Sequence, residues 1–362
     1  MLGHQKQDGN RSALSNMRSE MKLPKKPVVS PHRLGMSLVE VLVALAIIGI
    51  LVSLLLPAIQ AAREAARMTV CRNNLKQIGL AVHLYHNVNN VFPPTFCLQG
   101  TGVREDSWSV HGRILPYLEQ NQAYARVDLD RDWHLQVDSG VPALKIPIYL
   151  CPSDPNTRVR HKNGKPYVQP ITYGFNMGTW LIYDPRSGQS GSGVFRVNES
   201  TRIAQVIDGL SQTLCTAEVQ GYTPYLRNTP VMDPVFPGSP AVFSGWSGQE
   251  KMGPVRSSQT GHTVWADGRV HHTGFTTTFP PQTVVPYVSG GCRYDIDVTT
   301  IQEGLSSSQP TYAAITSRSH HAGVVNGLLM DGAVRPFRRS IHRSVWLGLG
   351  DVADRQALNL PQ

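Results

Sequence analysis

The stretch VLVALAIIGILVSLLLPAI, residues Val41 to Ile59, decides the fold, because its 19 residues include no charged side chain. At a rise of about 1.5 Å per residue, a helix of this length crosses a hydrocarbon core of roughly 30 Å. Backbone groups in lipid must hydrogen-bond to one another, so the stretch is predicted to be helical. Pro57 lies near its end, where we expect a kink and not a break.

A basic segment precedes the apolar stretch. Residues 1–35 contain seven Lys and Arg side chains against Asp8 and Glu20, whereas the rest of the chain has 27 basic and 23 acidic residues. Because Lys and Arg beside a spanning helix stay in the cytoplasm, we expect the N-terminus there and residues 60–362 to be exported. Much of the formal net charge of +9 therefore lies in the first segment. The mild excess of basic over acidic residues in the rest of the chain does not indicate a nucleic-acid partner.

A cleaved secretory signal is the alternative for this region. The apolar part of such a signal usually has about 7–15 residues and ends in a cleavage site of small residues. The stretch here is longer, it continues into further helical sequence, and only AIQA near Ala58 resembles such a cleavage site. We therefore favour a single-pass anchor in the cytoplasmic (inner) membrane, with the C-terminal domain periplasmic or extracellular.

The residues before the anchor, RLGMSLVE from Arg33 to Glu40, resemble the type IV prepilin processing site. The resemblance implies that a prepilin peptidase and N-methyltransferase cuts after Gly35 and methylates Met36, where the family usually has Phe. It also implies that Glu40 meets the N-terminal amine of a neighbouring subunit, because a carboxylate in lipid is costly unless a cation offsets it. The alternative is a Glu40 side chain that reaches water. Translation from Met21 instead of Met1 would give a shorter leader.

An amphipathic helix is predicted to continue beyond the membrane. Apolar residues recur at alternating steps of three and four, which places them on one helical face: Met68, Cys71, Leu75, Ile78, Val82 and Tyr85. One helix from about Met36 to Val88 is therefore expected, ended by Asn89-Asn90 and Pro93-Pro94. His83 and His86 stand at i, i+3 as a possible metal pair, but they lack a third ligand and are interpreted as packing residues.

The exported part is predicted to be β-rich, because short β-type runs alternate with Gly, Pro, Asn and Asp after Pro94. Asp-Gly pairs at 208–209, 267–268 and 331–332 predict tight hairpin turns. The expected organisation is a leader of residues 1–35, a transmembrane helix of 36–59, an amphipathic helix of 60–92 and an exported domain of 93–362.

His321 and Asp331-Gly332 form an H-x9-DG signature. Together with CRNNLKQIGLAVHLYHNVNNVFPP from Cys71, LCPSDP, TYGFNMG and VIDGLSQTLCTAEV, it resembles a group of bacterial pilin-like proteins of unknown function. The resemblance implies an α+β, pilin-like fold. We interpret His321 as a hydrogen-bonding residue that pins the last hairpin to the core. A catalytic or metal interpretation would instead join His320, His321 and Asp331.

Five cysteines lie in or beyond the predicted helix, at positions 71, 97, 151, 215 and 292. An exported domain permits disulfides, and an odd number leaves at least one cysteine unpaired or intermolecular. The sequence assigns no partners, and our first guess pairs Cys71 with Cys151. Because there is no C-x-x-C, zinc is not expected.

Searches for enzymatic motifs find no phosphate loop, no H-E-x-x-H and no G-x-S-x-G, so no catalytic residue, cofactor or metal is predicted. We expect a pilin-like or pseudopilin-like envelope protein that assembles with similar subunits through its N-terminal helix.

The alternative is a membrane-tethered protein that binds a solute or glycan. Its stacking surfaces would come from Trp108, Trp133, Trp180, Trp246 and Trp265, although such residues are more often core. An envelope hydrolase would need an acid/base pair that the sequence does not reveal. The sequence identifies no ligand.

Overall fold

The structure is a computed structural model that describes residues 36–98, 107–253 and 260–354. Gly35 and the predicted leader lie outside these residues. The chain divides into two compact units, Met1–Pro57 and Ala58–Gln362.

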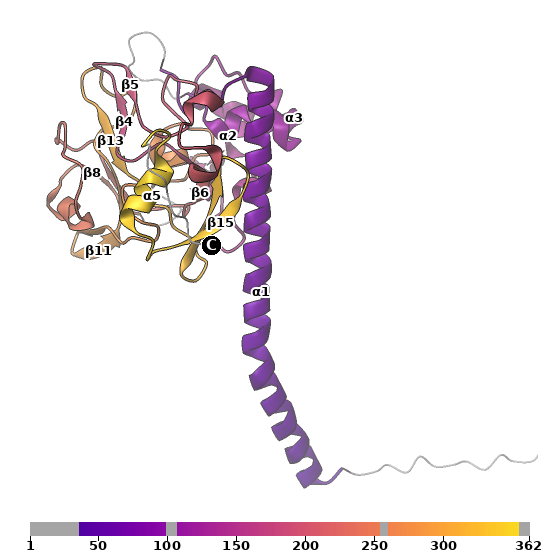
Figure 1. Ribbon diagram of the computed structural model, residues 1–362. Coiled ribbons are helices and arrows are strands. Elements are labelled where there is room, and N and C mark those ends of the chain that lie inside the picture. Colours follow the sequence, from indigo (N-terminus) through magenta and orange to yellow (C-terminus); the bar gives the residue numbers. More distant parts are fainter. Residues whose placement is uncertain (1–35, 99–106, 254–259, 355–362) are drawn as a thin grey trace, which may run out of the picture. The chain divides into compact units, whose positions relative to one another are not determined.

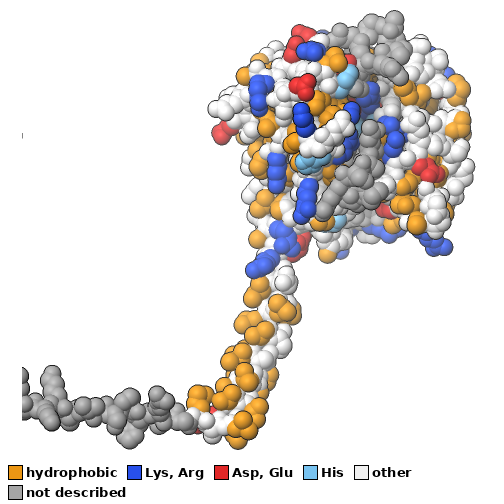
Figure 2. All heavy atoms as spheres, turned by 180° about the vertical axis from the view of Figure 1, so that it is seen from behind, with side chains coloured by type: hydrophobic (Ala, Val, Ile, Leu, Met, Phe, Trp, Pro, Cys, Tyr) orange, Lys and Arg blue, Asp and Glu red, His pale blue; other side chains and the backbone are white. Residues whose placement is uncertain are grey.

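The first helix, α1, is Leu38–Asn89, and it continues through Pro57. A capping box begins it: the Ser37 amide donates to Glu40 Oε2 at 2.8 Å, and the Glu40 amide donates to Ser37 Oγ at 3.2 Å. Asn90, with a φ of 59°, ends the helix in the left-handed region, as the Asn-Asn pair predicted. α1 is long and apolar enough to cross a membrane. Hydrophobic side chains cover its exposed N-terminal part (Figure 2).

The second half of α1 contributes one face to the core of the larger unit. Cys71, Leu75, Ile78 and Val82 are fully buried, as the apolar spacing predicted. Gly79 allows a close approach to the sheet, because a Cβ atom there would lie 2.8 Å from Leu328 Cδ2.

A five-stranded sheet lies beside this half of α1, in the order β15-β14-β6-β3-β9 (Figure 1). All neighbours are antiparallel except β3 and β9. The strands are β3 Tyr173–Asn176, β6 Leu214–Glu218, β9 Gly274–Phe275, β14 Val324–Leu329 and β15 Val334–Arg338. The C-terminal helix α5, Arg343–Gly350, packs on this sheet through Trp346, whose ring centroid is 5.3 Å from that of Phe337.

A six-stranded sheet has the order β5-β4-β13-β12-β7-β8, with β12 and β7 parallel. Its strands are β4 Leu181–Asp184, β5 Gln189–Ser190, β7 Tyr225–Arg227, β8 Gln249–Lys251, β12 Asp297–Thr299 and β13 Thr311–Ala314. Two hairpins are separate from both sheets: β1 Arg160–Lys162 with β2 Lys165–Val168, and β10 Pro286–Ser289 with β11 Cys292–Asp295.

Short helices connect these sheets. The α-helices are α2 Val110–Arg113, α3 Asn121–Tyr124 and α4 Val270–Thr273. The 3-10 helices are η1 Leu115–Leu118, η2 Trp133–Ser139, η3 Val141–Ala143, η4 Pro147–Tyr149, η5 Ile203–Gln205, η6 Leu210–Gln212 and η7 Pro240–Gly245. A long N-terminal helix followed by a β-rich domain confirms the predicted α+β class.

The hydrophobic core has two parts. The larger cluster contains the buried face of α1 and the five-stranded sheet. A smaller cluster lies at the six-stranded sheet, and its buried members are Trp180, Leu226, Phe243, Phe279, Val285, Tyr287, Ile296, Val298 and Ala314.

Only the last Asp-Gly pair forms the predicted hairpin. Asp331-Gly332 connects β14 to β15, with Gly332 at a φ of 87°. Asp208-Gly209 instead separates η5 from η6, because no strand precedes it and β6 starts only at Leu214. The 267–268 prediction is also wrong. Asp267 forms an isolated bridge with Trp108, and Gly268 is needed for a close backbone contact, since a Cβ atom there would overlap the Thr95 carbonyl oxygen.

Replacing Gly268 should therefore destabilise the domain. We expect Gly268→Ala to lower the free energy of unfolding by about 1–3 kcal/mol, because the added methyl meets backbone that cannot move aside. Gly245→Ala is the matched control, since its Cβ atom has no neighbour within 4 Å, and it should stay within about 0.5 kcal/mol. Denaturant unfolding of the purified protein measures both. Equal stability of the two variants would contradict the contact.

Candidate functional site

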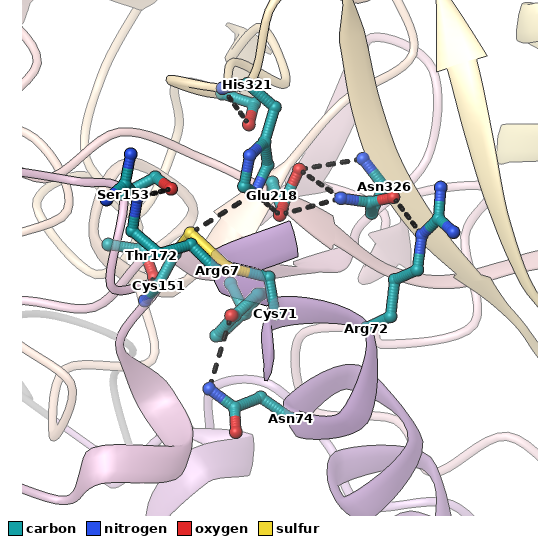
Figure 3. A network of polar contacts seen from close by, with 12 residues as sticks. Arg67, Cys71, Arg72, Asn74, Cys151, Ser153, Thr172, Glu218, His321 and Asn326 are labelled. Carbon is teal, nitrogen blue, oxygen red and sulfur yellow. Dashed lines mark hydrogen bonds and ion pairs between the residues drawn. A yellow bond between two sulfur atoms is a disulfide. The ribbon is translucent and has the colours of Figure 1, made fainter. Parts of the chain in front are cut away.

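His321 lies just before β14, is 2% exposed, and lies beside Glu218 (Figure 3). Its Nδ1 atom is 2.6 Å from Glu64 Oε1 on α1, and its Nε2 atom is 3.3 Å from Glu218 Oε1 on β6. Burial lowers the pKa of His321, but Glu218 and Glu64 outweigh burial and raise that pKa above its usual value. The two acidic groups therefore favour the protonated form of His321.

Glu218 is held from the side opposite His321. It is 1% exposed, and its Oε2 atom accepts a 2.7 Å hydrogen bond from the Asn326 amide of β14. The Asn326 side-chain amide donates to both carboxylate oxygens of Glu218, at 3.1 and 3.2 Å. Arg72 Nε on α1 donates to Asn326 Oδ1 at 3.1 Å. One polar network thus joins α1, β14 and β6.

Glu64 is the partly exposed end of the same network. It accepts hydrogen bonds from Arg67 Nε at 2.8 Å and from Ser153 Oγ at 3.1 Å. Burial raises the pKa of Glu64, but hydrogen bonds from His321, Arg67 and Ser153 outweigh burial and lower it. Glu64 therefore ties α1 to His321 and to the segment that follows η4.

A disulfide lies next to His321. Cys71 on α1 is bonded to Cys151, with Cα atoms 5.3 Å apart, which confirms the guessed pairing. Cys151 Sγ is 3.5 Å from His321 Nε2. Asn74 Nδ2 on α1 also donates to the Leu150 carbonyl oxygen at 3.1 Å. The LCPSDP segment is thus attached to α1 by a covalent bond and by side-chain hydrogen bonds.

The two ends of the H-x9-DG signature have different surroundings. Asp331 is exposed, and its Oδ1 atom accepts the Ala333 amide at 2.9 Å within the turn. His320 Nε2 is 3.5 Å from Asp154 Oδ1. Within the described part of the chain, no hydrogen bond or ion pair joins Asp331 to either histidine. The alternative that joined His320, His321 and Asp331 in one centre is therefore not supported, whereas His321 does bond beside the last hairpin.

The histidines of α1 serve packing, as the sequence indicated. His83 Nε2 is 2.7 Å from the Met330 carbonyl oxygen, and the ring centroid of His86 is 4.7 Å from that of Phe92. Both contacts fix the end of α1 against neighbouring segments.

Sequence reasoning missed Glu64 and Glu218. Glu64 lies seven residues before Cys71, which is about two helical turns and places both on the same face. Glu218 ends β6, whose five residues are all buried. A carboxylate in such a strand needs a charged or hydrogen-bonding partner. A Glu within an otherwise apolar strand was therefore the feature by which the sequence could have identified Glu218.

A second polar site is a cavity of about 390 Å³. Its lining includes Trp133, Arg160, Tyr167, Arg227, Asp267, Arg269 and His272. Asp267 pairs with Arg269 at 3.2 Å, so the guanidinium groups of Arg160 and Arg227 are the cations in excess. Arg160 packs over the Tyr167 ring, 5.1 Å from its centroid. Burial, followed by the charge of Arg160, lowers the pKa of His272 well below its usual value, and His272 Nδ1 is buried without a hydrogen bond. Guanidinium groups and aromatic rings around one hollow suit an anionic ligand.

The network around His321 should make stability depend on pH. Because the folded state raises the pKa of His321, its stabilisation is present below about pH 6.5, the usual value, and declines as pH rises through the folded value. We expect His321→Gln to lower the free energy of unfolding by about 3–5 kcal/mol at pH 6, since it leaves Glu218 buried without its cation.

Denaturant unfolding of both proteins at pH 6 and pH 9 measures this effect, and the difference between them should shrink at the higher pH. His320→Gln is the matched control, and it should cost less because the His320 side chain is 31% exposed. A difference that grows between pH 6 and pH 9 would oppose the assignment.

Comparisons with known proteins identify the family of this chain. A family model described as protein of unknown function (DUF1559) matches residues 60–344, and a model of the prokaryotic N-terminal methylation motif matches residues 31–56. A segment of 61 residues is 33% identical to type II secretion system core protein G of Pseudomonas aeruginosa, covering 17% of this chain and 43% of that protein. The chain thus spans less than half of that relative's length, and no solved structure matches it. Since the first match covers most of the sequence, this chain belongs to the pilin-like DUF1559 family and carries the prokaryotic N-terminal methylation motif.

Proposed function

We propose that this protein is a membrane-anchored, pseudopilin-like subunit with a structural or interaction role and no catalytic activity. A prepilin peptidase and N-methyltransferase removes the leader after Gly35 and methylates Met36. The N-terminal helix then assembles with pilin-like subunits, and the β-rich domain is carried outside the cytoplasm. The methylation motif and the similarity to a type II secretion core protein support this proposal.

The exposed apolar surface of α1 is the observation that most strongly supports anchoring and assembly through this helix. Every residue from 36 to 63 is exposed, and Leu54 exposes 70% of its surface. A continuous apolar surface of this length needs lipid or other helices as its surroundings, because soluble proteins rarely expose large contiguous apolar patches. A single anchor that also contacts neighbouring helices satisfies this need.

Glu40 is the residue that would select a partner within the membrane. Its Oε2 atom accepts the Ser37 amide, and within the described residues no hydrogen bond uses Oε1. A carboxylate at this depth gains from a cation, and the methylated amine of Met36 on a neighbouring subunit is the one that processing supplies. Glu40 therefore both begins its own helix and offers an oxygen to a second chain.

Substitutions at Glu40 separate these two roles. Glu40→Gln keeps a side-chain acceptor for the Ser37 amide but removes the charge, so it should insert normally and lose subunit contact. Ser37→Ala is the matched control, because it removes one half of the capping box and leaves the carboxylate. Disulfide cross-linking between copies that carry Gly49→Cys measures contact in native membranes, with mass spectrometry of the mature N-terminus as a check on processing.

The expected result is at least a tenfold loss of cross-linked product in Glu40→Gln and little change in Ser37→Ala. Wild-type cross-linking in Glu40→Gln would contradict a charge-dependent assembly. A mature chain that starts downstream of Pro57 would contradict the anchor itself.

A second candidate function is favoured by the arginine-lined cavity. In this alternative, the tethered domain binds an acidic glycan, whose carboxylates pair with guanidinium groups while its ring faces lie on aromatic side chains. The volume of about 390 Å³ falls within the usual range for small-ligand sites.

Thermal unfolding with added oligogalacturonate tests this alternative. Ligand present at about 100 times its Kd should stabilise the wild type by about 2.7 kcal/mol, whereas a neutral oligosaccharide should not. Arg227→Gln should abolish the stabilisation, and Arg186→Gln, which lies outside the cavity lining, should retain it. Equal responses to acidic and neutral sugars would rule out this use of the cavity.

A further inference from the structure

Four potential metal ligands converge beside α1. The ligand atoms of Cys71, Cys151, Glu218 and His321 all lie within 4.8 Å of one another, and all four residues are buried. They come from α1, the segment after η4, β6 and the segment before β14 (Figure 3). Residues so far apart in sequence meet only in the folded domain.

The distances around His321 Nε2 suit a tetrahedral ion. Zinc bonds of about 2.0–2.3 Å to N, O and S place neighbouring ligand atoms roughly 3.3–3.8 Å apart in a tetrahedron. His321 Nε2 is 3.3 Å from Glu218 Oε1 and 3.5 Å from Cys151 Sγ. Two edges of a tetrahedron are therefore already present.

Second contacts orient both non-sulfur ligands. His321 Nδ1 faces Glu64 Oε1 at 2.6 Å, so Nε2 is directed toward the cysteines. Asn326 holds Glu218 through its backbone and side-chain amides. A carboxylate behind a histidine ligand is the common arrangement in zinc sites, where it fixes the ring and increases its basicity.

We propose that the dithiol form of this protein binds one Zn²⁺ through Cys71, Cys151, Glu218 and His321. A dithiol reductant supplies two electrons and two protons to the Cys71–Cys151 bond and is itself oxidised to a disulfide. Zinc binding then releases both thiol protons and the proton on His321 Nε2. The disulfide and the ion use the same sulfur atoms, so each excludes the other, and every chain passes through the dithiol form before its disulfide forms.

The surroundings suit the charge of such a site. The two thiolates and Glu218 exceed the ion by a single negative charge, and Glu64 beside His321 adds a second. Arg67 donates to Glu64 at 2.8 Å, and Arg72 reaches Glu218 through Asn326. Thiolate and imidazole ligands favour zinc over magnesium or calcium. Glu64, whose side chain is 31% exposed, marks the side from which an ion can enter.

Cobalt titration of the full chain in detergent tests the proposal. Co²⁺ takes the place of zinc, and its absorption spectrum depends on the type and geometry of its ligands. Protein reduced under anaerobic conditions and freed of reductant should bind one equivalent, with thiolate-to-cobalt charge-transfer bands and tetrahedral visible bands. The oxidised wild type is the matched control, since it retains Cys97, Cys215 and Cys292 and should give neither set of bands.

Variants identify the ligands. His321→Ala should lose the tetrahedral spectrum, Glu64→Gln should bind about 10- to 100-fold more weakly, and His320→Ala should bind as the wild type does. Reduced and oxidised wild type with the same spectrum would overturn the proposal, and that comparison decides the question even if His321→Ala does not fold. Unchanged binding by a folded His321→Ala would overturn it equally.

Discussion

The contact of the buried His321 side chain with Glu64 and Glu218 is the interaction on which the larger unit depends. Two carboxylates from α1 and β6 would be costly near each other without a cation, and His321 supplies it from the segment before β14. Removing His321 leaves Glu218 buried without a cationic partner, whereas removing either carboxylate leaves His321 with the other one. The interaction therefore specifies how the helix, the central strand and the last hairpin meet.

Other contacts make that meeting point rigid. The Cys71–Cys151 disulfide fixes α1 two turns beyond Glu64, and Gly79 brings the same helix against Leu328 of β14. Arg72 and Asn326 continue the polar network along the sheet. The disulfide, the Gly79–Leu328 contact and the polar network thus all join the second half of α1 to the rest of the domain. The N-terminal part of the same helix has an apolar surface without partners in the described chain, which is the surface that lipid or other subunits would cover.

Local patterns explain what could be predicted from the sequence. Uncharged residues 41–59, the apolar spacing from Met68 to Tyr85 and the Asn-Asn end determine α1 through short-range rules. The last hairpin was predictable because strands flank Asp331-Gly332, whereas 208–209 and 267–268 lack that context. Glu64 and Glu218 could not be paired with His321, because their separation along the chain hides their contact. For the same reason the spacing of the cysteines did not show which of them meet, and the fold joins Cys71 to Cys151.

The division of the core into two clusters has a consequence for how this chain can change over time. The smaller cluster consists of buried residues from Trp180 to Ala314 and includes no residue of α1. Substitutions confined to the smaller cluster therefore do not touch α1 directly, whereas Ile182 and Ala313 of the same six-stranded sheet belong to the larger cluster. Different side chains in the smaller cluster can thus be combined with an unchanged contact between α1 and the five-stranded sheet.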